Sequence, residues 1–227
     1  MIDSHAHGAG GGGAQGTSFS ILRRGLRALG LEDDEATIGR LLAYADLLVK
    51  WNRTYNLTAV RDPQQMLYQH LLDCLAVIPA LDRRLGDSAA RLLDVGSGGG
   101  LPGAVLASMR SRWTVCCVDA AAKKASFVRH VASELHLQNL QAEHARVETL
   151  HRPPHDVVLS RAFAPLCDFA TLTRRHVAPG GCWLAMKGRR PEEELAVVPA
   201  DVEVFHVEQL MVPGLDAQRC LIWMRPR

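Results

Sequence analysis

A glycine-rich segment near the middle of the chain has the residue types and spacing of a ligand-binding loop. It runs from Asp94 to Gly103 and reads Asp-Val-Gly-Ser-Gly-Gly-Gly-Leu-Pro-Gly. The segment follows an apolar run typical of a strand and precedes a run typical of a helix. Glycines at such a junction let a ligand approach the backbone, and the first helical turn offers free N–H groups. Ligands of open α/β sheets bind at this edge, so we expect a small-molecule site here.

Two carboxylates define the kind of ligand. Asp94 stands two residues before Gly96, where it would repel a pyrophosphate and attract a cation. A dinucleotide-binding loop also needs a glycine where this chain has Leu101. Asp119 ends the next predicted strand and can accept hydrogen bonds from ribose hydroxyls; its alternative role is to cap the following helix. S-adenosylmethionine, which carries an ammonium and a sulfonium group and no phosphate, fits this pattern. The predicted contacts are the two acids and the loop glycines Gly96, Gly98 and Gly100.

The elements that position this loop alternate along the chain. Strand-like runs are Arg91–Val95, Trp113–Val118, Leu140–Ala142, Asp156–Leu159 and Cys182–Met186, and helical stretches lie near Leu101–Met109, Lys123–Leu135 and Pro165–Val177. Apolar strands that alternate with helices predict a mostly parallel, doubly wound, Rossmann-like α/β sheet covered on both faces. The last two strands, Val202–Val207 and Arg219–Met224, are too close in sequence for a helical crossover, so we expect an antiparallel hairpin.

Composition divides the chain into three parts. Residues 1–18 are rich in glycine and almost free of apolar side chains, which predicts a flexible tail. Residues 19–86 have helical periodicity and predict a small helical N-terminal region, in which Asp62 caps a helix that begins at Pro63. Residues 87–227 form the predicted cofactor-binding domain.

Charge and cysteine content exclude several classes of protein. The 26 Lys and Arg residues against 24 Asp and Glu residues give a net charge of +2, so any contact with nucleic acid must come from a local patch. The six cysteines form no C-x-x-C pair, which argues against zinc and against a secreted disulfide framework. No apolar stretch reaches the roughly 18 residues of a membrane span. We therefore expect a cytoplasmic protein that binds neither metal nor membrane.

With these residues in place, the chain resembles class I methyltransferases, and more closely the RsmG (GidB) family of bacterial ribosomal RNA methyltransferases. The resemblance extends from about Leu41 to the C-terminus. It rests on Lys50-Trp51-Asn52, Tyr55-Asn56-Leu57-Thr58, His70-Leu71-Leu72-Asp73, the loop from Asp94 to Gly103, Arg146-Val147-Glu148, Ser160-Arg161-Ala162-Phe163, Lys187-Gly188 and Val212-Pro213-Gly214-Leu215. Members of this family methylate N7 of a guanine in 16S ribosomal RNA, and the resemblance implies the same activity here.

The resemblance also implies which residues contact the cofactor. They are Gly96, Leu101, Val147, Glu148 and Arg161. The chain departs from the family at Gly99, where proline is common. This departure predicts a slightly looser turn with the same ligand.

Methylation of guanine N7 needs an aligned acceptor more than it needs a base. N7 has a free lone pair at neutral pH, so we predict no catalytic nucleophile or base, and candidate positioning residues instead. Arg161 can bind a cofactor carboxylate or an RNA phosphate, and Lys187 is the second candidate. Phe163 can stack on a flipped base or pack in the core. The segment that carries Arg161 and Phe163 lacks the Asn/Asp-Pro-Pro-aromatic motif that holds exocyclic amines.

Basic residues cluster near the predicted cofactor edge. They are Lys123, Lys124, Lys187, Arg189 and Arg190. We expect them to contact RNA; their alternative role is a solvated surface, since acidic residues lie beside them. Trp51 and Tyr55 are interpreted as packing between the helical region and the sheet.

The predicted partner is 16S ribosomal RNA in or near the small ribosomal subunit, bound by a monomer. Two other hypotheses follow from the same residues. The chain can be a methyltransferase that acts on another RNA, a protein or a small molecule. Alternatively, it can be a non-catalytic RNA-binding protein with a vestigial cofactor pocket.

Overall fold

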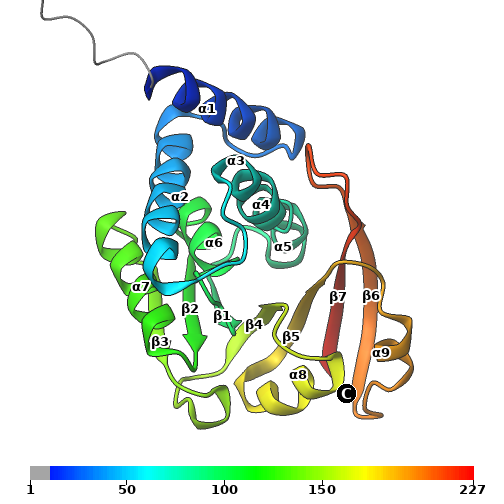
Figure 1. Ribbon diagram of the computed structural model, residues 1–227. Helices are drawn as coiled ribbons and strands as arrows, with labels where there is room; N and C mark the ends of the chain where they lie inside the picture. Colours follow the sequence, from blue (N-terminus) through cyan, green and yellow to red (C-terminus); the bar gives the residue numbers. More distant parts are fainter. Residues whose placement is uncertain (1–10) are drawn as a thin grey trace, which may run out of the picture.

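A seven-stranded sheet runs through the centre of the structure, with helices on both faces (Figure 1). This computed structural model describes residues 11–227. The strands are β1 (Ala90–Val95), β2 (Trp113–Asp119), β3 (Leu140–His144), β4 (His155–Arg161), β5 (Val177–Lys187), β6 (Val202–Leu210) and β7 (Arg219–Pro226). Their order is β3-β2-β1-β4-β5-β7-β6; β1 to β5 are parallel, and β7 is antiparallel to both of its neighbours. The predicted mostly parallel sheet with a terminal antiparallel hairpin is confirmed.

Helices precede the sheet and connect its strands. They are α1 (Gly11–Ala28), α2 (Glu35–Tyr55), α3 (Pro63–Met66), η1 (Leu67–Leu72), α4 (Asp73–Leu75), α5 (Ile78–Leu85), α6 (Gly103–Met109), α7 (Ala122–Glu134), η2 (Val147–Thr149), α8 (Leu166–Thr173), η3 (Arg174–His176) and α9 (Glu192–Ala196). The π-helical segment η1 joins α3 to α4 without a break. Asp62 caps α3 by accepting a hydrogen bond from the N–H of Gln65 at 2.7 Å, as predicted.

Both faces of the sheet are buried, which explains why its strands are apolar at successive positions. On β1, Leu92 faces a core shared with α1 to α7, whereas Leu93 and Val95 face a second core beneath α8. The first core includes Leu22 of α1 and Leu41 of α2. The N-terminal helices therefore share one core with the sheet and are held in a defined place against one of its faces.

The structure corrects two predicted boundaries. Residues 11–18 of the predicted tail begin helix α1, and residues 1–10 lie outside the described residues. Leu22 and Leu26 are fully buried, and extending an anchored helix costs far less than starting one, so α1 continues back through the glycines. The helix predicted to reach Val177 ends before it, because Val177 pairs with His155 and begins β5.

Two glycines in the helical region offer a matched test of how α1 packs. A Cβ at Gly25 in α1 would overlap Leu72 of η1, whereas a Cβ at Gly39 in α2 would meet no atom within 4 Å. We expect Gly39→Ala to raise the free energy of unfolding by up to about 1 kcal/mol, because alanine favours the helix. Gly25→Ala should lower it by about 1 kcal/mol or more, because overpacking outweighs that gain. Denaturant unfolding measures both, and equal stabilisation by the two substitutions would contradict this packing.

Candidate functional site

The loop after β1 turns sharply around glycines with positive φ angles. Gly96, Gly98 and Gly100 have φ values of 66°, 59° and 79°. The N–H groups of Gly96 and Ser97 donate to the carbonyl of Val118, at 2.9 and 3.3 Å, which ties the loop to β2. A Cβ at Gly98 would meet no atom within 4 Å, so this position faces open space. The backbone is therefore open to a ligand at Gly98. At Gly100 a Cβ would lie 3.1 Å from side-chain atoms of Ala104 and Val128, so a contact of Gly100 with the cofactor stays a prediction.

Helix α2 supports this loop from the N-terminal region. The hydroxyl of Tyr44 donates a hydrogen bond to the carbonyl of Gly99 at 2.7 Å. Burial raises the pKa of Tyr44 well above its ordinary value, so the hydroxyl keeps its proton. Leu48 Cδ1 would lie 3.0 Å from a Cβ at Gly99. The loop is thus held by α2 at the position where proline is common in the family that the chain resembles.

Asp119, at the end of β2, accepts hydrogen bonds from two backbone segments. Its Oδ2 accepts the N–H of Gly98 at 3.0 Å, and its Oδ1 accepts the N–H of Ala121 at 2.9 Å. The N-cap of α7 is Ala121, so the alternative interpretation of Asp119 as that cap residue is wrong. The carboxylate lines a cavity of about 400 Å³ at the C-terminal ends of β1, β2 and β4. It is placed to accept hydrogen bonds from a bound ribose.

The residues on the far side of this first cavity come from η2 and from the loop after β4. Val147, Glu148 and Phe163 line it. Arg175 holds η2 in place by donating to the carbonyls of Leu150 at 2.9 Å and Val147 at 3.4 Å. The structure therefore brings Val147 and Glu148, which the resemblance implied, to the same cavity as Asp119.

Asp94 lies beneath the loop and does not line either cavity described here. Its side chain is fully buried, and its Oδ2 accepts the N–H of Gly103, the first residue of α6, at 2.8 Å. Burial raises the pKa of this carboxyl to about 7, so Asp94 is partly protonated at neutral pH. A direct contact of Asp94 with the cofactor stays a prediction, whereas the hydrogen bond to Gly103 shapes the loop.

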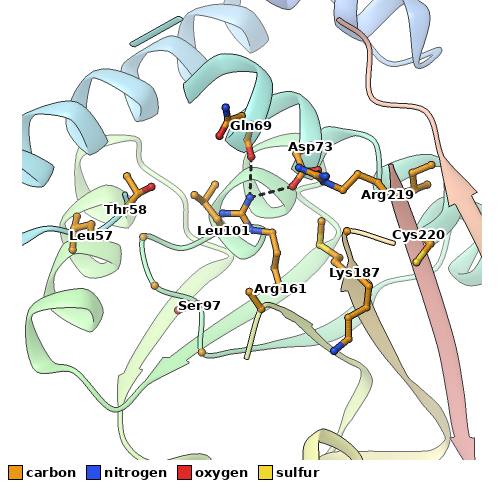
Figure 2. Close-up of a pocket in the computed structure, with 17 residues that line it drawn as sticks. Leu57, Thr58, Gln69, Asp73, Ser97, Leu101, Arg161, Lys187, Arg219 and Cys220 are labelled. Atoms are coloured by element: carbon orange, nitrogen blue, oxygen red, sulfur yellow. Dashed lines mark hydrogen bonds and ion pairs between the residues drawn. The ribbon is translucent and has the colours of Figure 1, made fainter. Parts of the chain in front are cut away.

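A second cavity, of about 410 Å³, opens on the other side of the loop (Figure 2). Gly96 and Ala162 line both cavities, so the two adjoin there. Other walls of the second cavity come from distant parts of the chain: Leu57, Thr58, Gln69, Leu101, Lys187 and Arg219. Leu101 was implied by the resemblance, and it faces this second cavity rather than the first.

A buried carboxylate holds two arginines in the wall of the second cavity (Figure 2). Asp73 is 3% exposed; its Oδ2 accepts from Nη1 of Arg161 at 3.1 Å, and its Oδ1 accepts from Nε of Arg219 at 2.6 Å. Arg161 also donates to the carbonyl of Gln69 at 3.1 Å. Two guanidinium groups against one carboxylate leave a net positive charge, so this wall can bind an anion.

The sequence identified only one member of this group. Arg161 was a candidate, but Asp73 and Arg219 were not, because only the fold brings residues so far apart in sequence together. Asp73 ends the block His70-Leu71-Leu72-Asp73, and a buried acid in an otherwise apolar stretch was the available signal.

His70 connects this wall to the loop after α2. Its Nε2 lies 2.6 Å from the hydroxyl of Thr58, and its Nδ1 lies 3.4 Å from Nη1 of Arg161. Burial and the neighbouring Arg161 lower the pKa of His70 to about 4, so the ring is neutral at pH 7. His70 therefore adds hydrogen bonds and no charge to the cavity wall.

Three of the five predicted RNA-contacting residues form ion pairs with carboxylates, and two do not. Lys187 is paired with Glu194 at 2.8 Å, Lys124 with Asp119 at 3.5 Å, and Arg190 with Glu192 at 2.7 Å. Lys123 and Arg189 are exposed and have no ion-pair partner among the described residues. They lie beyond the ends of β2 and β5, two strands separated by β1 and β4. Free positive charge thus flanks the cavities on both sides.

The aromatic candidates pack within the protein. Phe163 meets Phe169 edge-to-face, with ring centroids 6.3 Å apart, and a Cβ at Gly96 would lie 2.7 Å from its ring. The structure therefore favours packing over base stacking for Phe163. Trp51 contacts the rings of Tyr55 and Phe127 at 5.2 and 5.4 Å, which agrees with the predicted packing role.

The described part of the chain has neither a membrane-spanning helix nor a cluster of metal-ligating side chains. Over residues 11–227, no helix is both long and apolar enough to cross a membrane. The same residues contain no group of three or more His, Cys, Asp or Glu side chains placed to hold a metal ion.

The residues of the two cavities fit S-adenosylmethionine. The open space at Gly98 admits a ligand against the loop, and Asp119 is an acceptor for the ribose. Asp94 lines neither cavity and contributes from beneath the loop, through its hydrogen bond to the N–H of Gly103. The wall formed by Arg161, Asp73 and Arg219 suits an anionic group such as the cofactor carboxylate.

Comparison with solved structures supports the fold. The chain is similar to TrmN from Thermus thermophilus, with a TM-score of 0.55 and 19% identity over 74% of this chain and 55% of that one. It is also similar to a SAM-dependent methyltransferase from Aquifex aeolicus, with a TM-score of 0.53 and 18% identity over 72% of this chain and 93% of that one. These likenesses show the class I methyltransferase fold.

Comparison with sequence families goes further. The model for rRNA small subunit methyltransferase G (GidB) matches residues 37–222. The chain is 57% identical to ribosomal RNA small subunit methyltransferase G of Leptothrix cholodnii over 91% of this chain and 94% of that one. It is 58% identical to the protein of the same name from an Acidovorax species over 92% of this chain and 96% of that one. The chain therefore belongs to the rRNA small subunit methyltransferase G (GidB) family.

Proposed function

We propose that this protein transfers a methyl group from S-adenosylmethionine to N7 of a guanine in 16S ribosomal RNA. We further propose that it acts as a monomer in the cytoplasm, on RNA in or near the small ribosomal subunit. Family membership supports methylation of small-subunit ribosomal RNA, and the resemblance supports guanine N7.

The observation that supports the mechanism is that the two cavities adjoin at Gly96 and Ala162. Asp119, Val147 and Glu148 suit the adenosine half of the cofactor in the first cavity. Gly96 and Ala162 line both cavities, so a methyl group carried past them reaches the second. The target base would then enter the second cavity, where its N7 can face the methyl group along the line of displacement.

The residues of the second cavity position the reactants and transfer no proton. When bound, S-adenosylmethionine supplies the methyl group and a neutral thioether leaving group. Arg161 and Arg219, held by Asp73, bind an acidic group, which is the cofactor carboxylate or an RNA phosphate. His70 is neutral, and its two ring nitrogens contact Thr58 and Arg161, which fixes the positions of these two side chains relative to each other. No side chain needs to act as a base, because N7 carries a lone pair at neutral pH.

Electrostatic attraction of the RNA is assigned to the unpaired cations. Lys123 and Arg189 are exposed on opposite sides of the cavities, where a phosphate backbone can contact both. The paired cations Lys124, Lys187 and Arg190 contribute less, because carboxylates already neutralise them. The alternative functions, methylation of another substrate or RNA binding without catalysis, are not favoured by family membership.

The reaction product gives a direct test. Purified protein is incubated with isotopically labelled S-adenosylmethionine and with unmodified 16S ribosomal RNA, either naked or in small subunits. Nucleoside mass spectrometry should detect labelled 7-methylguanosine in at least one of the two substrates. A different labelled nucleoside would overturn the assignment to N7, and label in neither substrate would overturn the proposed activity.

A substitution in the glycine loop tests the cofactor site. Gly98→Asp should weaken binding of S-adenosylhomocysteine by about two orders of magnitude or more, because the side chain fills the space through which the ligand reaches the backbone. Gly30→Asp is the matched control, since Gly30 also has a positive φ, 67°, and open space around it. Calorimetry compares the two. Equal affinities would remove the loop from the cofactor site.

The unpaired cations make the salt dependence of RNA binding a test. The double substitution Lys123→Ala with Arg189→Ala should weaken RNA binding and reduce the slope of log affinity against log salt by about 1 to 2. Arg24→Ala with Arg91→Ala removes two exposed charges from α1 and from the start of β1, at the opposite end of that strand from the cavities. Filter-binding titrations that give one slope for both double variants would show that the flanking cations do not contact RNA.

A further inference from the structure

We propose that Glu194 is a positioning residue, which acts with Lys187 to hold the segment between the two cavities in its functional shape. This inference rests on the proposed function, because it assigns a role in cofactor binding. Glu194 itself lies in α9 and lines neither cavity. Its influence on the cofactor must therefore pass through the residues that it contacts.

Glu194 contacts the segment after β4 at two points, directly at Leu166 and through Lys187 at Ala164. Its Oε2 accepts the N–H of Leu166, the first residue of α8, at 2.7 Å. Its two carboxylate oxygens accept hydrogen bonds from Nζ of Lys187 at 2.8 and 3.0 Å. The same Nζ donates to the carbonyl of Ala164 at 3.2 Å. One ion pair thus holds the backbone at Ala164 and at Leu166.

The stretch just before these contacts forms the boundary of the two cavities. Ala162 lines both cavities and has a φ of 59°, which is unfavourable for a residue with a Cβ. Phe163 follows and packs against Gly96 at the start of the glycine loop. A strained residue keeps its conformation only when its surroundings hold it. The contacts of Glu194 and Lys187 anchor the chain two to four residues further on.

The direction of Lys187 supports this role over a direct contact with RNA. Figure 2 shows its amine pointing away from the group formed by Arg161, Asp73 and Arg219. Its side chain is only 18% exposed, and that of Glu194 is 29% exposed. The ammonium group of Lys187 is therefore paired within the protein, with Glu194, and does not face the solvent as a free charge.

The chain contains its own control for this proposal. Glu192, Glu193 and Glu194 are consecutive, so substitutions among them change the same charge on the same short helix. The side chain of Glu193 is exposed and has no hydrogen bond or ion pair to another described residue, which makes Glu193→Gln a matched control. Gln is close to Glu in shape but carries no charge, so Glu194→Gln removes the ion pair with Lys187 with little change in packing.

The test measures S-adenosylhomocysteine binding by calorimetry and stability by denaturant unfolding. We expect Glu194→Gln to raise the dissociation constant about tenfold, which corresponds to the loss of one charge-assisted hydrogen bond. Glu193→Gln should leave the dissociation constant at the parent value. Equal dissociation constants for the two variants, with unfolding curves like that of the parent, would overturn the proposal. If the parent protein itself does not bind S-adenosylhomocysteine, the proposed function fails instead.

A second variant keeps the test decisive if Glu194→Gln does not fold. Lys187→Met removes the ammonium but keeps the aliphatic stem and the hydrogen bond from Leu166 to Glu194. It should also weaken S-adenosylhomocysteine binding. The variant with both substitutions should bind no more weakly than the more weakly binding single variant, because each substitution already removes the Glu194–Lys187 ion pair. The salt dependence of RNA binding should stay at the parent slope. Parent-like cofactor affinity together with a reduced salt slope would show that Lys187 is an RNA contact and that the pair has no positioning role.

Discussion

The close approach between the loops after β1 and β4 depends on the missing side chain at Gly96. A Cβ there would lie 2.7 Å from the ring of Phe163, so any other residue would require the Phe163 side chain or the loop to move. Because they touch, Gly96 and Ala162 form one wall that both cavities share. The two cavities adjoin at these two residues, so under the proposed function a methyl donor in one can reach an acceptor in the other directly. Methyl transfer needs such a direct approach of donor and acceptor, and the proposed function places it at this boundary.

The two acids that the sequence predicted to bind the cofactor, Asp94 and Asp119, do not have the same environment in the structure. Asp119 faces its cavity, but Asp94 is buried beneath the loop, and burial raises the pKa of Asp94 to about 7. Asp94 accepts the N–H at the start of α6, so its role in this structure is to shape the loop. The clearest buried anion at the site is Asp73, which holds Arg161 and Arg219 side by side. The second cavity therefore has a wall with net positive charge.

The N-terminal helices are part of the site and not an appendage to the sheet. Tyr44 of α2 supports the glycine loop, and Asp73 orients an arginine from β4 and another from β7. These contacts are possible because the helices share a core with the sheet. The segment with His70 and Thr58 lines or supports the second cavity from the side opposite the strands.

The sequence by itself determined the sheet, the glycine loop, Asp119 and the family, because each depends on local periodicity or on residues close together in the chain. Only the tertiary structure decided the rest. In the folded chain Asp94 is buried and Lys187 is paired with Glu194. Asp73 is paired with both Arg161 and Arg219. Burial and ion pairing are properties of neighbours in space, and residues 73, 161 and 219 are neighbours only once the helical region has packed onto the sheet.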